Sequence, residues 1–163
     1  MYPLFIIIIR ESFPNLYKNQ AIPPMSLVEH ELARIDLSNP RLIINTYLDG
    51  KYSTPNILEY VEVLEAALTP LQAPFVVIYD ITLMGWVGAK ERIVAGRAMG
   101  AMEKRIGENY FATISVIPNP VARLVSKGVA LAAQPAKPVV FVSSMEKAQR
   151  RAKVFMQKMP VKL

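Results

Sequence analysis

The sequence predicts an α/β fold, in which about four helices cover a mixed sheet of about five strands, with an opening hairpin followed by parallel strands. Two observations lead to this prediction. The run Phe75–Ile81 is almost continuously apolar apart from Asp80, as is typical of a strand buried on both faces of a helix-covered sheet. Shorter apolar runs then alternate with segments of helical periodicity, and such alternation implies parallel strands joined by crossover helices.

The length of 163 residues is sufficient for one domain with a full core. We assign this domain to residues 25–163, because residues 1–24 differ in character. Their apolar block Leu4–Ile9 is too short to span a membrane and lacks the preceding positive charge of a signal peptide. We expect residues 1–24 to form an arm that pairs with a sheet edge or a second subunit. The alternatives are an extra strand, or upstream sequence ahead of a start at Met25.

The first elements of the domain are predicted to be two strands and a helix. His30–Leu37 and Leu42–Leu48 form the opening hairpin, and Asp49-Gly50 is a turn signal at its end. Thr54-Pro55 is the predicted helix start. The Thr54 hydroxyl is expected to accept a hydrogen bond from a free amide of the first turn, and Pro55 fits this turn because no amide donor is needed there. Apolar residues then recur at helical spacing, at Ile57, Val61, Leu64, Leu68 and Leu71.

The second half of the chain continues the alternation of helices and strands. The predicted elements are the helix Ala89–Ile106, the strand Tyr110–Ile117, a helix from Asn119-Pro120 to about Ala133, the strand Val139–Val142, and a last helix that begins with a capping box at Ser143 and Glu146. The first of these helices contains Gly96 and Gly100, which give it a flat face. We expect that face to pack closely on the sheet, and the alternative is a surface for another helix or a partner.

The composition excludes several kinds of site. The chain has no cysteine and one histidine, so disulfides, thiolate metal sites and histidine-based catalytic triads are not expected. We expect His30 to lie on a strand surface. No paired acid, base and nucleophile can be named, and we therefore predict a protein without enzymatic activity, metal or cofactor.

Charge is distributed unevenly along the sequence. Residues 1–86 carry 5 Lys and Arg against 9 Asp and Glu, whereas residues 87–163 carry 14 against 4. This asymmetry indicates either solvated helix surfaces or an anionic partner. Specific binding of nucleic acid is not expected, because no aromatic residues interleave with the cations. We predict a basic patch that joins two helices and consists of Arg123, Lys127, Lys147, Arg150 and Arg151.

The order of elements resembles the STAS superfamily, the domain shared by anti-sigma-factor antagonists and the cytoplasmic ends of sulfate transporters. The resemblance covers about Leu42 to Phe155 and is greatest to stand-alone bacterial members of uncharacterised role. It implies a cytoplasmic regulatory module that binds proteins. The matching features are the turn at Gly50 and Thr54-Pro55, the strand Val76–Asp80, the strand Thr113–Ile117 before Asn119-Pro120, and Val140–Ser144 before a helix that contains Ala148.

The sequence departs from the STAS pattern where antagonists are phosphorylated. There, an Asp-Ser or Asp-Thr followed by Ser-Gly begins the helix after the central strand. Between Asp80 and Ala89, the only hydroxyl in this chain is that of Thr82, several residues early. We therefore expect the usual phosphorylation switch to be missing. Thr82 is the remaining candidate for phosphorylation, and Ser115 on the next strand is a second one.

The leading functional hypothesis is a module that binds a partner protein through the loop after the central strand and the helix that follows. Trp86 is either an exposed anchor or a lid on the core. Asp80 lies at the carboxyl edge, where open α/β sheets bind ligands, but it could also cap the loop. Gly85 and Gly88 are too few for a phosphate cradle. The predicted partner-binding residues are Asp80, Gly85, Trp86, Gly88, Lys90 and Arg97.

Two other functions are compatible with the sequence. The apolar content of 52% and the eight methionines favour a carrier or sensor of a small apolar or amphipathic ligand, held between helices and sheet. The cationic, amphipathic last helix favours association with a membrane surface. An apolar arm and a glycine-faced helix also make a homodimer an expectation.

Overall fold

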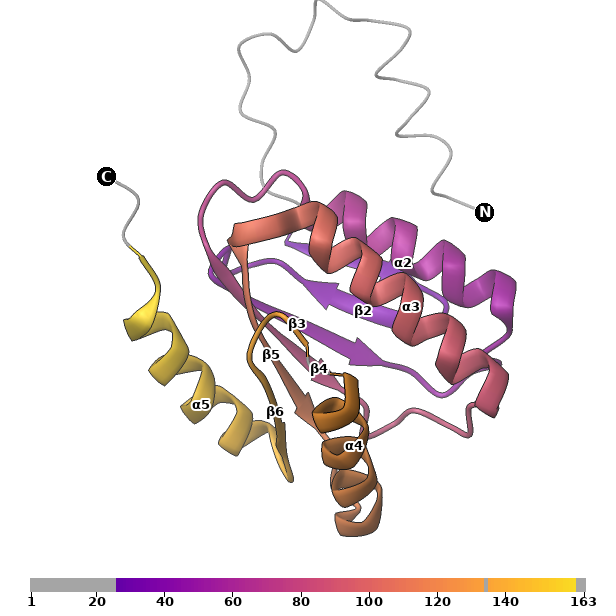
Figure 1. Ribbon diagram of the computed structural model, residues 1–163. Helices are drawn as coiled ribbons and strands as arrows, with labels where there is room; N and C mark the ends of the chain where they lie inside the picture. The colour runs from indigo at the N-terminus through magenta and orange to yellow at the C-terminus, as the bar shows by residue number, and fades with distance from the viewer. Residues whose placement is uncertain (1–25, 134, 161–163) are drawn as a thin grey trace, which may run out of the picture.

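A computed structural model describes residues 26–133 and 135–160 (Figure 1). In this part of the chain, six strands form one mixed sheet, and four α-helices and a short 3-10 helix complete the α/β fold. The spatial order of the strands, β1-β2-β3-β4-β5-β6, follows their order along the chain. Within the described residues, no helix combines the length and the apolar character that crossing a membrane requires. The predicted arm, residues 1–24, lies outside the described residues.

The sheet begins with antiparallel strands and continues with parallel ones. β1 (Leu27–His30), β2 (Ala33–Asp36) and β3 (Leu42–Tyr47) pair antiparallel. The following strands pair parallel, each with the one before it: β4 (Phe75–Asp80), β5 (Tyr110–Val116) and β6 (Val139–Val142). The predicted opening hairpin and parallel strands are thus confirmed.

The prediction missed strand β1. The expected strand His30–Leu37 is interrupted by a turn at Glu31 and Leu32, so that its second part is β2 and its first residue ends β1. The sequence of β1 alternates half-buried and exposed residues over only four positions. Such a short edge strand gives a weak pattern, because just two of its side chains face the core.

The helices lie on both faces of the sheet. α2 (Thr54–Leu68), α3 (Ala89–Ile106) and α4 (Pro120–Ala133) are the crossovers between successive parallel strands, and the short helix η1 (Gly107–Asn109) follows α3. Since every crossover moves in the same direction across the sheet and such crossovers are right-handed, the three helices belong to one layer. The last helix, α5 (Met145–Lys158), packs on β4 and β5 on the opposite face (Figure 1).

Strand β4 joins the two halves of the core. Phe75, Val77 and Tyr79 contribute to the cluster beneath α2 and α3, whereas Val76 and Ile78 contribute to the cluster beneath α5. All five side chains are buried. The prediction that this run is a strand buried on both faces is confirmed, since alternate side chains of a strand point to opposite faces.

Two helix starts differ from the predicted caps. The N-cap position of α2 is occupied by Ser53 rather than by Thr54, and the Ser53 side chain accepts no hydrogen bond from the first amides of the helix. The Thr54 hydroxyl is instead buried inside the first turn without a partner among the described residues. At α5, Ser144 rather than Ser143 is the cap and accepts from the Lys147 amide at 3.4 Å. In both cases the boundary moves by one residue, which the hydroxyl-rich sequence does not resolve.

Candidate functional site: a pocket between helix α3 and the sheet

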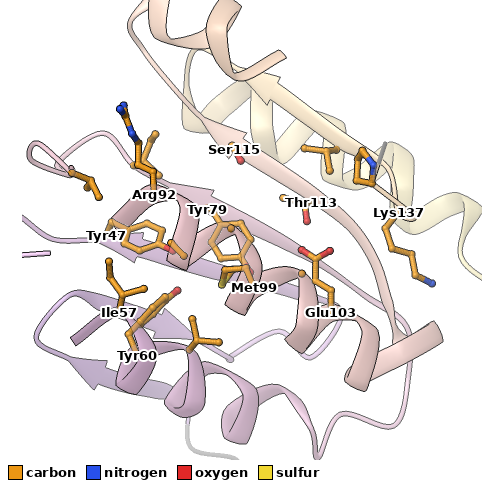
Figure 2. Close-up of a pocket in the computed structure, with 18 of the residues that line it drawn as sticks. Tyr47, Ile57, Tyr60, Tyr79, Arg92, Met99, Glu103, Thr113, Ser115 and Lys137 are labelled. Carbon is orange, nitrogen blue, oxygen red and sulfur yellow. The ribbon is translucent and has the colours of Figure 1, made fainter. Parts of the chain in front are cut away.

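A pocket of about 1020 Å³ lies between α3 and the sheet. Its floor comes from the parallel strands, with Tyr79 on β4, Thr113 and Ser115 on β5, and Val139 on β6. One wall is α3, and the opposite wall includes residues 135–137, which follow α4. Figure 2 shows that the lining extends from Lys137 at one side, past Met99 and Tyr79, to Tyr47 and Tyr60 at the other.

The pocket exists because α3 contacts the sheet less closely than α2 does. Met102 is the one fully buried side chain that the structure describes on this helix of 18 residues. The residues of α3 that line the pocket recur every three or four positions, which places them on one stripe of the helix surface. They are Arg92, Ala95, Gly96, Met99, Gly100, Glu103 and Lys104.

The two glycines of this stripe face open space. A Cβ atom added at Gly96 or Gly100 would meet no heavy atom within 4 Å. The expected close packing of this face on the sheet is therefore wrong. Side chains this small leave the gap unfilled, and the gap forms part of the pocket. Whether a partner helix binds this face remains a prediction.

Helix α3 is held in place by its contact with α2 rather than by the sheet. The Arg105 guanidinium donates two hydrogen bonds to the Glu65 carboxylate, each at 2.6 Å. This bidentate pair lowers the pKa of Glu65, mainly through the hydrogen bonds. Val94, Ala98 and Met99 pack against the core cluster beneath α2. These contacts position α3 against α2 from one side of the helix.

A cluster of tyrosines forms one end of the pocket. The ring centroid of Tyr47 lies 5.4 Å from that of Tyr60 and 6.2 Å from that of Tyr79. The Asn45 side-chain amide donates to the Tyr60 hydroxyl at 2.5 Å, and Asn45 is fully buried. Burial raises the pKa of Tyr47 to about 12 and raises the pKa of Tyr60 as well. These hydroxyls are therefore neutral hydrogen-bonding groups at physiological pH.

A second polar group lies beneath the middle of α3. The Tyr79 and Tyr110 hydroxyls are 3.0 Å apart, and the Tyr110 hydroxyl is 3.0 Å from the Thr113 hydroxyl oxygen. In Figure 2 the Glu103 carboxyl points toward Thr113, one of these hydroxyl-bearing residues. Burial raises the pKa of Glu103, and the Tyr110 hydroxyl and the charge of Lys137 oppose that shift. A few hydroxyls and one carboxyl thus converge on a space lined mainly by apolar and aromatic side chains.

Asp80 and Thr82 interact with each other at the carboxyl edge. The Asp80 carboxylate accepts from the Thr82 amide at 3.0 Å and from the Thr82 hydroxyl at 2.5 Å. Asp80 therefore caps the loop, as the alternative interpretation expected. A phosphate on Thr82 would lie beside this carboxylate, and the two negative charges would repel each other. Ser115 lies on β5 and lines the pocket.

Trp86 is an exposed side chain and does not cover the core. Its exposed fraction is 84%, and the guanidinium carbon of Arg92 lies 5.4 Å from the centroid of its ring. Val87 is the residue of this loop that is buried in the core. The two glycines permit close approaches: a Cβ atom at Gly85 would lie 2.9 Å from an Asp49 carboxylate oxygen, and one at Gly88 would clash with the Glu91 carboxylate.

The other predicted residues are distributed over three helices. Lys90 and Arg97 are exposed on α3. Arg123 on α4 donates to the carbonyls of Ile117 and Pro118, and Lys127 is exposed one turn later. The remaining predicted cations, Lys147, Arg150 and Arg151, lie on α5, on the opposite face of the sheet from α3 (Figure 1). The structure thus places the predicted basic patch as two separate groups.

His30 has a structural role. Its Nδ1 atom accepts from the Leu32 amide at 3.1 Å, and its ring lies 5.7 Å from that of Tyr60. It therefore stabilises the turn between β1 and β2. Among residues 26–133 and 135–160, no group of three or more His, Asp or Glu residues is arranged to hold a metal ion.

Sequence reasoning missed the pocket residues Tyr47, Tyr60 and Glu103. A signal for part of the site was present, because small residues recur at helical spacing at Ala95, Gly96 and Gly100 while the helix remains amphipathic. The tyrosines carry no such signal, since an aromatic residue at an inward position usually belongs to a closed core.

Comparisons of the chain with protein-family models, with curated proteins and with solved structures found no match. The site must therefore be interpreted from its own geometry. What the structure does show is the α/β fold with a mixed sheet, and the STAS resemblance remains a proposal beyond it.

Proposed function

We propose that this protein binds a small, mainly apolar organic ligand with a polar group, in the pocket between α3 and the sheet. The observation that carries the proposal is the unfilled volume of about 1020 Å³ beside Gly96 and Gly100. Known small-molecule sites are mostly apolar hollows of roughly 300–1000 Å³ with a few convergent polar groups. This pocket has the same character and lies at the upper end of that range.

The polar groups restrict the chemistry of the ligand. Burial favours neutral Tyr47 and Tyr60 hydroxyls and raises the pKa of Glu103, so these groups offer hydrogen bonds to a polar group of the ligand. Three basic residues also line the pocket: Arg92, Lys104 and Lys137. A hydroxyl or a carbonyl on an otherwise apolar skeleton fits both the lining and the hydroxyl chain. The protein would act as a carrier or sensor of such a molecule, and a sensor would agree with the regulatory role that the STAS resemblance implies.

A substitution at Gly100 tests the proposal, because it fills the pocket without a clash. In Gly100→Leu the added side chain enters open space, and replacing a helical glycine also favours the helix by up to ~1 kcal/mol. We expect saturable binding of the uncharged dye N-phenylnaphthylamine to the unmodified protein, measured by fluorescence. Gly100→Leu is expected to weaken that binding at least about tenfold, which is about 1.4 kcal/mol.

Gly128→Leu is the matched control. Gly128 is an exposed helical glycine on α4 with no heavy atom within 4 Å of an added Cβ, and it does not line the pocket. This variant should bind the dye as the unmodified protein does, and circular dichroism should show both variants folded. Equal binding by Gly100→Leu would refute the assignment of the site. Mass spectrometry of the native protein from its own source would then identify any retained ligand of a few hundred daltons.

A further inference from the structure

Exposed apolar side chains gather at the carboxyl ends of β4 and β5, near Arg92, which lines the pocket. Leu83 is 59% exposed in the loop before α3, and Ile93 is 56% exposed in the first turns of α3. Trp86 lies between them in sequence and is the most exposed of the three. Helix α4 adds an exposed stripe at helical spacing, which consists of Val121, Leu124 and Val125.

The sheet places these two groups beside each other. β4 and β5 are parallel neighbours, and Asp80 pairs with Val116 at the end of both strands. The Ile81 amide also donates to the Val116 carbonyl at 3.3 Å. The loop before α3 and the loop before α4 therefore leave the sheet at adjacent points of one edge. We call this region the carboxyl-edge surface. Its exposed apolar residues are Leu83, Trp86, Ile93, Val121, Leu124 and Val125. Its basic residues are Lys90, Arg92, Arg97, Lys127 and the half-buried Arg123.

The charge of this surface is mainly positive. Its five basic residues lie near three carboxylates, those of Asp49, Asp80 and Glu91, and Asp80 accepts hydrogen bonds from Thr82. The cations alternate with apolar residues along α3 and α4 instead of surrounding an apolar centre. Protein interfaces are depleted of charge at their centre. Membrane-surface sites instead combine apolar side chains that enter the acyl boundary with cations that contact anionic headgroups.

We propose that the carboxyl-edge surface docks on anionic phospholipid membranes, with Leu83, Trp86 and Ile93 inserted at the interface. Trp86 suits this position, because its ring is amphipathic and tryptophan is enriched at membrane interfaces. Arg92 belongs to the surface and also lines the pocket, so docking would bring this part of the pocket lining close to the lipid. The inference goes beyond ligand binding and does not depend on it.

The sequence-based hypothesis of membrane contact through the last helix fits the structure less well. The apolar stripe of α5, including Ala148 and Ala152, is buried against β4 and β5 together with Met159, which follows the helix. Its outward side offers cations without a continuous apolar face, since Val154 is its one large exposed apolar residue among those described. Helix α5 could attract headgroups but has little to insert.

Trp86 is the only tryptophan of the chain and reports directly on the proposed contact. The full chain, free of added ligand, is mixed with vesicles of phosphatidylcholine and phosphatidylglycerol, and with vesicles of phosphatidylcholine alone. We expect cosedimentation with the anionic vesicles, a shift of tryptophan emission to shorter wavelength, and weaker binding as salt is added. Cosedimentation without an emission shift would overturn the proposal, because the contact would then lie elsewhere.

Paired variants locate the contact. Leu83→Ser combined with Ile93→Ser keeps the tryptophan reporter and should weaken vesicle binding at least about tenfold, because two apolar side chains no longer insert. Leu58→Ser combined with Val154→Ser removes two exposed apolar residues from α2 and α5 and should bind as the unmodified protein does. Equal loss in the two double variants would overturn the proposal.

The charge is tested in the same way. Lys90→Gln with Arg97→Gln should weaken vesicle binding more than Lys153→Gln with Lys158→Gln, and the reverse order would assign the contact to α5.

The other occupants of this surface give different results. A second copy of the chain would shift the emission as protein concentration rises without lipid, and an acidic partner protein would leave all vesicle signals absent. Either result would overturn the proposal of membrane docking. Neither result would bear on dye binding in the pocket, which is measured separately.

Discussion

Tyr47 lines the pocket, and its hydroxyl lies near the hydroxyl of Tyr60 and the side-chain amide of Asn45. Burial removes the water that would stabilise a tyrosinate, so the pKa of Tyr47 rises from 10.0 to about 12. Tyr52, nearby, is raised to about 12 as well, mainly for the same reason. These tyrosines make the free energy of unfolding depend on pH in the alkaline range.

The free energy of unfolding should fall as pH rises from about 10 to about 12. In this window the unfolded chain releases the Tyr47 proton while the folded chain retains it, so deprotonation stabilises the unfolded state. Below pH 10 the contribution is fully present. Urea denaturation at several pH values measures this dependence.

Tyr47→Phe is the matched variant, because it keeps the ring and removes the titrating hydroxyl. Its free energy of unfolding should depend less steeply on pH in the same window, by about one proton. A slope identical to that of the unmodified protein would contradict the role given to Tyr47. Tyr52 and the other buried tyrosines should preserve part of the dependence in both proteins.

At the scale of secondary structure, α3 and α5 meet the sheet in different ways. Ala148 and Ala152 on α5 have no exposed area, and these small side chains allow the helix to approach β4 and β5 closely. On α3, Gly96 and Gly100 are smaller still, but this helix packs mainly against α2 and leaves a gap between itself and the sheet. Small residues on a helix face therefore lead to close packing in one case and to a pocket in the other.

Ala152→Leu is expected to destabilise the protein, because the larger side chain has no space between α5 and the sheet. Overpacking of this kind typically costs about 1–3 kcal/mol. Thermal or urea unfolding measures the loss. Gln149→Leu on the exposed side of the same helix is the control and should change the free energy of unfolding by less than ~0.5 kcal/mol. A similar loss in both variants would mean that α5 does not pack as closely as described.

This difference explains how much of the structure the sequence could predict. Helix α3 was predicted with its observed bounds, because its start and end are set by local signals at Gly88 and Gly107. Strand β4 was predicted because an apolar run of that kind is specific. A ligand held between helices and sheet was one of the hypotheses, but the residues of the pocket were not predicted. They depend on how α3 packs against α2, through contacts that include the Arg105–Glu65 pair. A single sequence does not encode such long-range geometry in a local pattern.

At the scale of the whole molecule, helices cover both faces of the sheet at its centre, and its edge strand β1 is covered less completely. β4 is buried on both faces, whereas β1 alternates exposed and half-buried residues at one edge. The local free energy of opening should follow this gradient. The site lies between the two extremes, because a stable floor of β4 and β5 supports one wall that is anchored to α2.

Hydrogen exchange should reveal this gradient directly. Backbone amides of β4 and β5 should exchange most slowly, close to the rate of global unfolding, and those of β1 should exchange fastest among the strands. Amides of α3 should be intermediate, and the dye that fills the pocket should slow their exchange more than that of β4. Equal protection of β1 and β4 would contradict a core centred on β4.

The position of α5 in the chain has a consequence for biosynthesis. Strands β1 to β6 pair in the order in which they are made, so the face covered by α2, α3 and α4 can assemble as the chain emerges. The opposite face of β4 and β5, with Val76, Ile78 and Ile114, is covered by α5 among the described elements, and α5 is made after all six strands. The nascent chain therefore exposes this apolar face of the sheet during translation. Chaperones that bind apolar segments should recognise it until α5 has been synthesised and has packed on the sheet.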